Sequence, residues 1–291
     1  MQAPILSLQH ASENWQRYIN ICNRCLTYAP YTVPFNQGHA DTIFTPYIAA
    51  NETLCLIGSR EKNGKTEEGV VHISLLAGDE KFAILHLLLA DSNDVAWSLL
   101  QQAESWAAAR SKLIRSHNLR LNPYSCLMHG TESYCWGGLY STRNAFTRQN
   151  WDLELDIINM YLDMPDCPDI CDSGLEIIEV DNSEDDLSVN GKFRVIRKGE
   201  ALASCGYTYH KAISQHFGKG IGQLWIHAQT ESHGQGYGLH VITAAHNRLY
   251  KLGARRVILA TNNALFRAVK FYEKLGYKPE LIHAFTFQKE L

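Results

Sequence analysis

The sequence predicts an α/β protein with two domains. Segments typical of strands alternate with segments typical of helices, and one strand–helix–strand order occurs twice, at residues 81–121 and again at residues 224–261. The chain has 291 residues, more than one small α/β domain needs for its core. Two domains of similar build are therefore the natural expectation.

The first half of the chain is expected to open with helices and a β-hairpin. Apolar residues recur at helical spacing in Ser12–Ala29, and a second helix is predicted at Thr42–Asn51. Apolar runs at Leu54–Ser59 and Val70–Leu76 flank the polar stretch Arg60–Glu68, which predicts two strands and a turn. The residues expected to face inward from the first helix are Trp15, Tyr18, Ile19, Cys22 and Leu26.

The first strand–helix–strand unit follows this hairpin. Lys81–Ala90 is typical of a strand, Asp94–Arg110 of a helix and Leu113–Leu121 of a second strand. A further strand is predicted at Leu155–Leu162.

A linker is expected after this strand, because Met164–Pro168 combines two prolines with acidic residues. The predicted domains are therefore residues 1–166 and residues 167–291. Strands expected in the second domain are Leu175–Val180, Lys192–Lys198, Ala201–Tyr209, Gln223–Gln229, Arg255–Thr261, Tyr277–Glu280 and Ala284–Lys289; its helices are Leu239–Gly253 and Ala264–Leu275.

The most informative motif is the glycine loop His233-Gly-Gln-Gly-Tyr-Gly238, which stands between a strand and a helix. Glycines at alternate positions let backbone N–H groups point into one small volume, because no Cβ blocks a ligand. Amides that also form the first turn of a helix attract anions. The motif therefore predicts a phosphate-binding loop, although the same glycines also suit a turn without a ligand.

Neighbouring patterns exclude some alternatives. Gly218-Lys-Gly-Ile-Gly222 has similar spacing, but a strand follows it, so it is interpreted as a turn between strands. No Gly-Lys-Ser/Thr ends the loop at Gly238, which argues against a P-loop for Mg-ATP, and a dinucleotide fingerprint is only partly matched.

The order of glycine loop, helix, strand and helix resembles the GNAT acetyltransferase superfamily. The family's loop reads Arg/Gln-x-x-Gly-x-Gly/Ala, and its later helix often ends in Tyr-Glu-Lys-Leu-Gly-Phe, similar to Tyr272-Glu-Lys-Leu-Gly-Tyr277. The similarity covers roughly residues 220–285. Two positions depart from it: His233 stands where the family usually has Arg or Gln, and Leu265 where an Asn often precedes the tyrosine.

The resemblance implies a tandem fold, with two GNAT-like domains that each have a mixed, mostly antiparallel central sheet flanked by helices. It also implies that acetyl-CoA is the co-substrate and that an amine attacks its thioester directly in a ternary complex. The residues expected to hold the CoA moiety are Ile226, Ala228, His233, Gly234, Gln235, Gly236, Tyr237, Gly238, Leu239, Asn262 and Leu265.

Three residues are candidates for proton transfer. Tyr272 would protonate the departing thiolate, since a phenol with a pKa of about 10 is a donor at neutral pH. His227 is the titratable group on one face of the preceding strand and is the first candidate for the general base. Glu231 is the second candidate, and a water chain without a dedicated base is a further alternative.

The first half is interpreted as a degenerate copy of the module. Asp91-Ser-Asn-Asp94 replaces the glycine loop, and these carboxylates would repel phosphate. Aligning Ala145–Trp151 with Phe271–Tyr277 places Phe146 opposite Tyr272, so the hydroxyl is missing as well. The first domain is therefore expected to keep the fold without binding the cofactor.

Composition limits the partners. The net charge of −3 predicts neither nucleic acid nor an anionic membrane as a partner. The absence of a signal-like N-terminus and of a long apolar run favours the cytoplasm. The eight cysteines, including the Cys22/Cys25 and Cys167/Cys171 pairs, lack zinc-site spacing, so no metal is predicted.

The leading hypothesis is an acetyl-CoA-dependent N-acetyltransferase that acts on a primary amine of a small molecule or peptide, as a monomer or homodimer. Longer acyl-CoA donors remain open, because loop glycines recognise CoA and not the acyl group. A non-catalytic CoA-binding or interaction protein with the same fold is the alternative, and a zinc-dependent binding module is a third.

Overall fold

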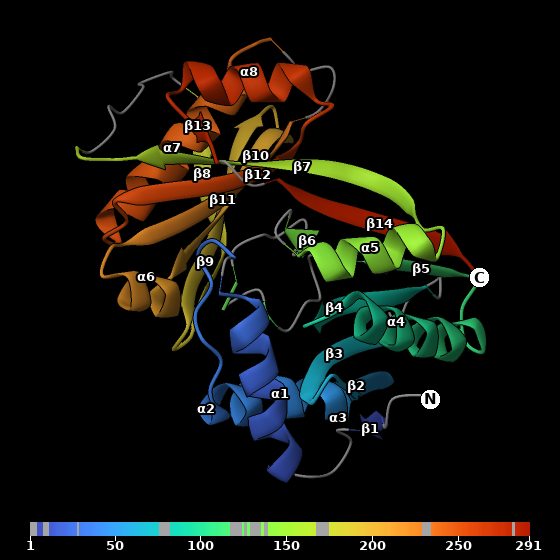
Figure 1. The fold of residues 1–291 in the computed structure, drawn as a ribbon. Helices are drawn as coiled ribbons and strands as arrows, with labels where there is room; N and C mark the ends of the chain where they lie inside the picture. Colours follow the sequence, from blue (N-terminus) through green and yellow to red (C-terminus); the bar gives the residue numbers. More distant parts are fainter. Residues whose placement is uncertain are drawn as a thin grey trace. The chain divides into compact units, whose positions relative to one another are not determined.

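A computed structural model describes the chain in the ranges 5–7, 12–27, 29–75, 82–116, 124, 127–128, 135–136, 139–166, 175–228, 234–280 and 283–291. The chain forms two compact units (Figure 1). Unit 1 contains residues 1–158, 262–264 and 281–291. Unit 2 contains residues 159–261 and 265–280. Each has the mixed sheet with flanking helices that the sequence predicts.

Unit 1 is built on a mostly antiparallel sheet in the order β1-β2-β3-β4-β5-β14-β7, with β6 beside β14. Among the strand pairs of this sheet whose register is described, only β4–β5 is parallel. Its strands are β1 (Ile5–Ser7), β2 (Thr53–Lys62), β3 (Lys65–Leu75), β4 (Ala83–Ala90), β5 (Leu113–Ser116), β6 (Cys135–Trp136), the first part of β7 (Asp152–Asp163) and β14 (Ala284–Glu290).

Helices cover both faces of this sheet. Its helices are α1 (Ser12–Cys25), α2 (Gln37–His39), the π-helix η1 (Ala40–Phe44), α3 (Thr45–Ala50), α4 (Asn93–Ala108) and α5 (Tyr140–Arg148). Helix α4 packs on β2, β3 and β4, and its Leu99 belongs to the same buried cluster as Val71 and Ile73 of β3. On the other face α1 packs on β3 and β4, with the predicted inward residues of α1 all buried.

Unit 2 repeats this plan in the order β7-β12-β11-β10-β9-β8, with β13 beside β7. The β11–β12 pair is parallel, and β8 through β11 pair antiparallel. Its elements are β8 (Glu176–Glu184), β9 (Ser188–Arg197), β10 (Glu200–His210), α6 (Lys211–Phe217), β11 (Ile221–Ala228), α7 (Tyr237–Lys251), β12 (Arg256–Asn262), α8 (Phe266–Lys274) and β13 (Lys278–Pro279). Helix α7 packs on β9, β10 and β11 (Figure 1).

The structure departs from the sequence-based prediction in three local features. Strands β2 and β3 continue through most of the predicted turn, so that only Asn63 and Gly64 remain as the turn, since a two-stranded ribbon tolerates charged residues beyond the core. Strand β8 likewise extends to Glu184, beyond its predicted end at Val180. Helix α6 was not predicted, because its seven residues are too few to show a clear period. Gly218 ends α6 in a left-handed conformation, so the stretch Gly218–Gly222 connects a helix to β11 and not two strands as predicted, and it presents no helix N-terminus.

The C-terminal strand has a partner that local pattern does not reveal. Strand β14 lies in unit 1, where it pairs with β5 and β7. Residues 281–291, 262–264 and 159–166 thus lie in other compact units than the domains predicted for them. The local sequence predicts that residues 284–290 form a strand, but which strands it pairs with depends on contacts between residues distant in the sequence. The boundary near residue 166 stays a prediction about the two repeated modules.

Candidate functional site

The glycine loop leads directly into α7. Gly234 and Gly236 have φ angles of 80° and 83°, and a Cβ on either would meet no atom within 4 Å. These left-handed conformations suit glycine, and they leave the backbone open to a ligand. Residues 229–233 lie outside the described residues, so the assignments of Glu231 and His233 stay predictions.

The first turn of α7 presents backbone amides beside the loop. Gly236 is the N-cap residue, and no side chain caps this end. The Leu239 N–H already donates to the Gly236 carbonyl at 2.9 Å, but the amides before it have no intrahelical acceptor, and the helix dipole favours an anion there. A Cβ on Gly238 would lie 3.3 Å from Ile226 Cδ1 on β11 and 3.8 Å from Phe271 Cζ on α8, so the start of α7 approaches both β11 and α8 closely.

The two parallel strands of unit 2 separate towards this loop. Backbone pairing of β11 with β12 covers Ile221–Gln223 and Arg256–Ile258, and no described residues continue it. On its other edge β11 stays paired with β10 as far as Ala228. The edge of residues 224–228 that faces β12 thus has backbone groups outside the ladder, and it includes Ile226 and Ala228, two residues predicted to bind CoA.

Tyr272 lies inside unit 2. It is the seventh residue of α8 and is only 5% exposed. Its ring packs edge-to-face on Tyr277 at 5.8 Å, and the Tyr277 hydroxyl lies 2.7 Å from His246 Nε2 on α7. Burial raises the pKa of Tyr277 well above its ordinary value, and nearby Cys205 and Tyr272 raise it further. Tyr272 therefore belongs to the layer where α7, α8 and β10 meet.

His227 lies on the opposite face of β11. Gln223, Trp225 and His227 share that face by strand alternation, as predicted. Gln223 is buried and its Oε1 accepts a hydrogen bond from His210 Nε2 at 2.8 Å, while Trp225 and His227 are exposed. The indole of Trp225 lies over Gly206, where a Cβ would come within 2.2 Å of the ring.

Three aromatic or histidine residues of β10 and β11 differ in accessibility. Desolvation lowers the pKa of the buried His210 to about 4. Tyr207 is buried and donates to Glu179 beneath α7. Trp225, at 45% exposure, is thus the one large aromatic surface of β11 open to solvent.

The remaining predicted CoA-binding residues occupy element ends. Asn262, the last residue of β12, accepts a hydrogen bond at Oδ1 from the backbone N–H of Ala264 (2.9 Å). Leu265 is the N-cap residue of α8, is 56% exposed and makes no side-chain cap bond. Gln235 and Leu239 are exposed on the loop and on the first turn of α7.

One residue beside the loop was missed by the sequence analysis. Arg197, at the end of β9, donates from Nη1 to the hydroxyl of Tyr237 at 2.8 Å. Tyr237 is the first residue of α7 and is 6% exposed. The only signal in the sequence was the cationic hairpin tip Arg197-Lys-Gly, which stands 40 positions from its partner.

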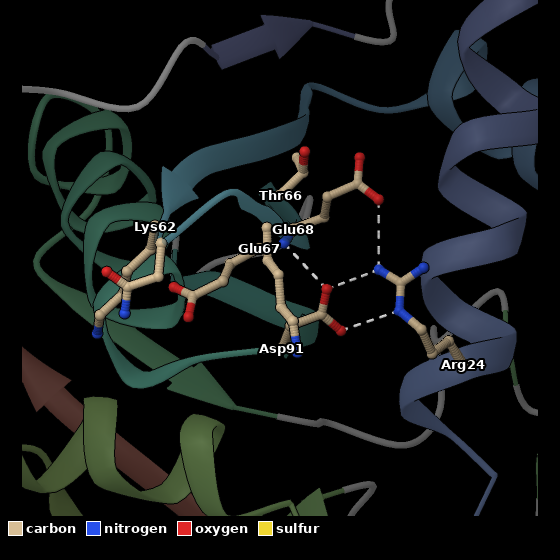
Figure 2. Close-up of a pocket in the computed structure, with 8 residues that line it drawn as sticks. Arg24, Lys62, Thr66, Glu67, Glu68 and Asp91 are labelled. Carbon is tan, nitrogen blue, oxygen red and sulfur yellow. Dashed lines mark hydrogen bonds and ion pairs between the residues drawn. The ribbon is translucent and has the colours of Figure 1, made fainter.

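The corresponding place in unit 1 is closed by the chain itself. Only Asp91 and Ser92 separate β4 from α4, against eight residues between β11 and α7. Asp91 receives two hydrogen bonds from Arg24 (3.0 and 2.7 Å) and one from the Glu68 N–H (3.0 Å), as Figure 2 shows. The neighbouring pocket of about 640 Å³ has a mixed lining of lysines and carboxylates. A carboxylate of the chain thus occupies the position that the loop amides open in unit 2.

The repeat also extends to the later helix. Parallel pairing begins at the first residue of the strand in both units and covers three pairs. Helices α5 and α8 are both nine residues long, and their N-cap residues Leu139 and Leu265 have nearly equal angles (φ −83° and −84°, ψ 65° and 64°). Phe146 is the seventh residue of α5, as Tyr272 is of α8.

The described part of the chain limits two other classes of site. It contains no helix long and apolar enough to cross a membrane. Among the same residues, no three His, Cys, Asp or Glu side chains are grouped to hold a metal ion. Cys22, Cys25, Cys55 and Cys205 are free thiols, and Cys167 and Cys171 lie outside the described residues.

Comparison with known proteins gives a family and a fold. Residues 173–277 match the model of the acetyltransferase (GNAT) family. The chain is similar over 99% of its length to a tandem GNAT protein from the clavulanic acid biosynthesis pathway (98% of that chain, 10% identity, TM-score 0.67). No curated protein matches.

Two further solved structures share this fold. One is a GCN5-related glucosamine N-acetyltransferase region of a fungal multi-domain β-N-acetylglucosaminidase, with TM-score 0.70, 13% identity and coverage of 99% of this chain and 38% of that one. The other is a GCN5-related N-acetyltransferase from Sphaerobacter thermophilus, with TM-score 0.61, 11% identity and coverage of 98% and 95%.

Proposed function

Because residues 173–277 belong to the GNAT acetyltransferase family, we propose that this protein transfers an acetyl group from acetyl-CoA to a primary amine. The observation that carries the proposal is the pair of open glycines, Gly234 and Gly236, at an uncapped helix N-terminus beside two separating strands. Amides at this end suit a diphosphate, and the free strand edge suits an extended amide-containing arm. The family and the fold support acyl transfer; the acceptor is part of the proposal.

The loop and strand residues would bind acetyl-CoA, which supplies an activated thioester. Residues 234–239 would hold the diphosphate, and the backbone of Ile226 and Ala228 would bond the pantetheine arm. Holding two substrates in register lowers the barrier by about 7–11 kcal/mol in well-oriented reactions. Positioning of acetyl-CoA and the amine is therefore the main contribution of this chain to catalysis.

Proton transfers complete the proposed reaction. The amine nitrogen forms a bond to the acetyl carbonyl carbon, and the carbon–sulfur bond breaks. Tyr272 gives its hydroxyl proton to the departing sulfur, while His227, exposed on β11, accepts a proton from the amine through water. Glu231 stays the second candidate for the base. The acetyl-CoA requirement also supports a cytoplasmic location.

The proposal is tested by two measurements. Millimolar CoA should raise the melting temperature of the wild-type protein, since a ligand that binds only the folded state stabilises it. CoA release with a panel of primary amines should then identify a substrate, and Tyr272→Phe should lower kcat by about 100-fold. The matched control Tyr250→Phe, on α7, should keep full activity. No thermal shift with CoA would refute the proposal.

The alternative is a CoA-binding protein without turnover. The 95% burial of the Tyr272 side chain is the observation that favours it, because a phenol packed in the core needs access to act as an acid. A thermal shift with CoA but no CoA release with any amine would support this alternative. Tyr272→Phe would then leave CoA affinity unchanged.

A further inference from the structure

The hairpin between β9 and β10 reaches past the end of β11. Ala228, the last residue of β11, pairs with Ala203, and β10 begins three residues earlier at Glu200, which pairs with Arg197. The hairpin tip therefore lies at the edge of the sheet where the chain leaves β11 for the glycine loop. This register, and not proximity in sequence, places Arg197 beside α7.

The Arg197 guanidinium is held by a neutral group. Its Nη1 donates to the Tyr237 hydroxyl at 2.8 Å, and Tyr237 is fixed by burial at the first position of α7. Across the hairpin Glu200 pairs with Arg197 through the backbone only, since no ion pair joins Arg197 to an acid among the described residues. The charge of Arg197 is thus fixed in position and not neutralised.

Two neighbouring arginines of unit 2, one on β9 and one on α7, are paired with carboxylates. Arg194, three residues earlier, has an ion pair with Asp181 at 3.4 Å. Arg248 on α7 bonds Glu179 at 3.2 Å. Arg197 differs because it has no carboxylate partner in the described part of the chain, and its side-chain hydrogen bond is to Tyr237, the first residue of α7.

From this arrangement we infer that Arg197 binds the diphosphate of CoA together with the amides of the glycine loop, and that Tyr237 is the residue that positions it. The inference rests on the proposed function. A planar guanidinium matches two phosphate oxygens and adds charge that backbone amides lack. The proposed diphosphate site would then consist of two segments distant in sequence, the glycine loop and the tip of the β9–β10 hairpin.

Binding of CoA and dephospho-CoA, measured by calorimetry, tests the inference. Arg197→Ala should weaken both ligands by about tenfold, since each carries the diphosphate, and Tyr237→Phe by about threefold. Arg194→Ala is the matched control and should bind as wild type does. Unchanged melting temperatures without ligand would exclude misfolding of the Arg197 variant.

The outcomes separate the two claims. If wild type binds CoA and Arg197→Ala binds it equally well, the role of Arg197 is refuted while the proposed function stands. If only CoA and not dephospho-CoA loses affinity, the contact is to the 3′-phosphate and the diphosphate assignment is refuted. If wild type binds no CoA, both claims are refuted.

Discussion

Acidification is expected to destabilise unit 2, because this unit contains two buried histidines, His210 and His246. Desolvation lowers the pKa of His210 and His246 in unit 2 to about 4, and that of His72 in unit 1 to about 3. All three are at most 5% exposed. Their neutral rings bond Gln223, Tyr277 and Tyr124.

The sign follows from the pKa difference. A histidine whose folded pKa lies below its unfolded value near 6.5 takes up a proton more readily when unfolded, so stability falls as pH drops below 6.5. Between pH 7 and pH 5 each histidine costs about 2 kcal/mol, from about 1.4 kcal/mol per pH unit over the 1.5 units below 6.5. Unit 2 therefore loses about 4 kcal/mol, a large part of the usual 5–15 kcal/mol.

Urea denaturation at pH 7 and pH 5, followed by hydrogen exchange in each unit, measures this loss. His246→Gln keeps a hydrogen-bonding group but cannot titrate, so the loss in unit 2 should fall by about half. His216→Gln replaces an exposed histidine on α6 and should leave the loss unchanged. Equal pH dependence of the wild type and His246→Gln would refute the reasoning.

Two further substitutions test the loop and the core. Gly236→Ala should cost about 1–2 kcal/mol in urea denaturation and weaken CoA binding, because its φ of 83° disfavours any Cβ. Gly238→Ala, which lacks a positive φ, is the control for stability alone, and equal stability of the two variants would contradict the strain argument. Phe287→Ala should destabilise unit 1 by about 3–5 kcal/mol, because Phe287 stacks on Phe146 at 4.7 Å in its core. The exposed Phe217→Ala is its control, and hydrogen exchange that weakens only in unit 2 would contradict the placement of β14.

Regular elements near the site were predictable because their patterns are local. The helical spacing after Gly238 predicts α7, and the apolar run before the loop predicts β11. Tyr272 and Gly236 could be proposed as site residues from short motifs, because the residue types within each motif suggest its chemistry. The short helix α6 escaped prediction, since seven residues show no clear period. Residues 229–233 lie outside the described part, so Glu231 and His233 stay untested.

Features that depend on long-range pairing were not predictable. The position of Arg197 on Tyr237 follows from the register of β9, β10 and β11, which no segment encodes alone. Whether a predicted site residue is accessible also depends on packing: His227 and Trp225 are exposed, while Tyr272 is buried although its motif gives no sign of this.

The sequence by itself determined the repeated module, the glycine loop that only the second copy retains, and the loss of a phenol from the first. These are properties of residue type and spacing, which the backbone expresses locally. The tertiary structure alone decided that β14 completes unit 1, that β11 and β12 part after three pairs, and that an arginine 40 positions away lies at the start of α7. Strand pairing joins residues distant along the chain, and the hydrogen bonds that select one partner become available only when the whole sheet has formed.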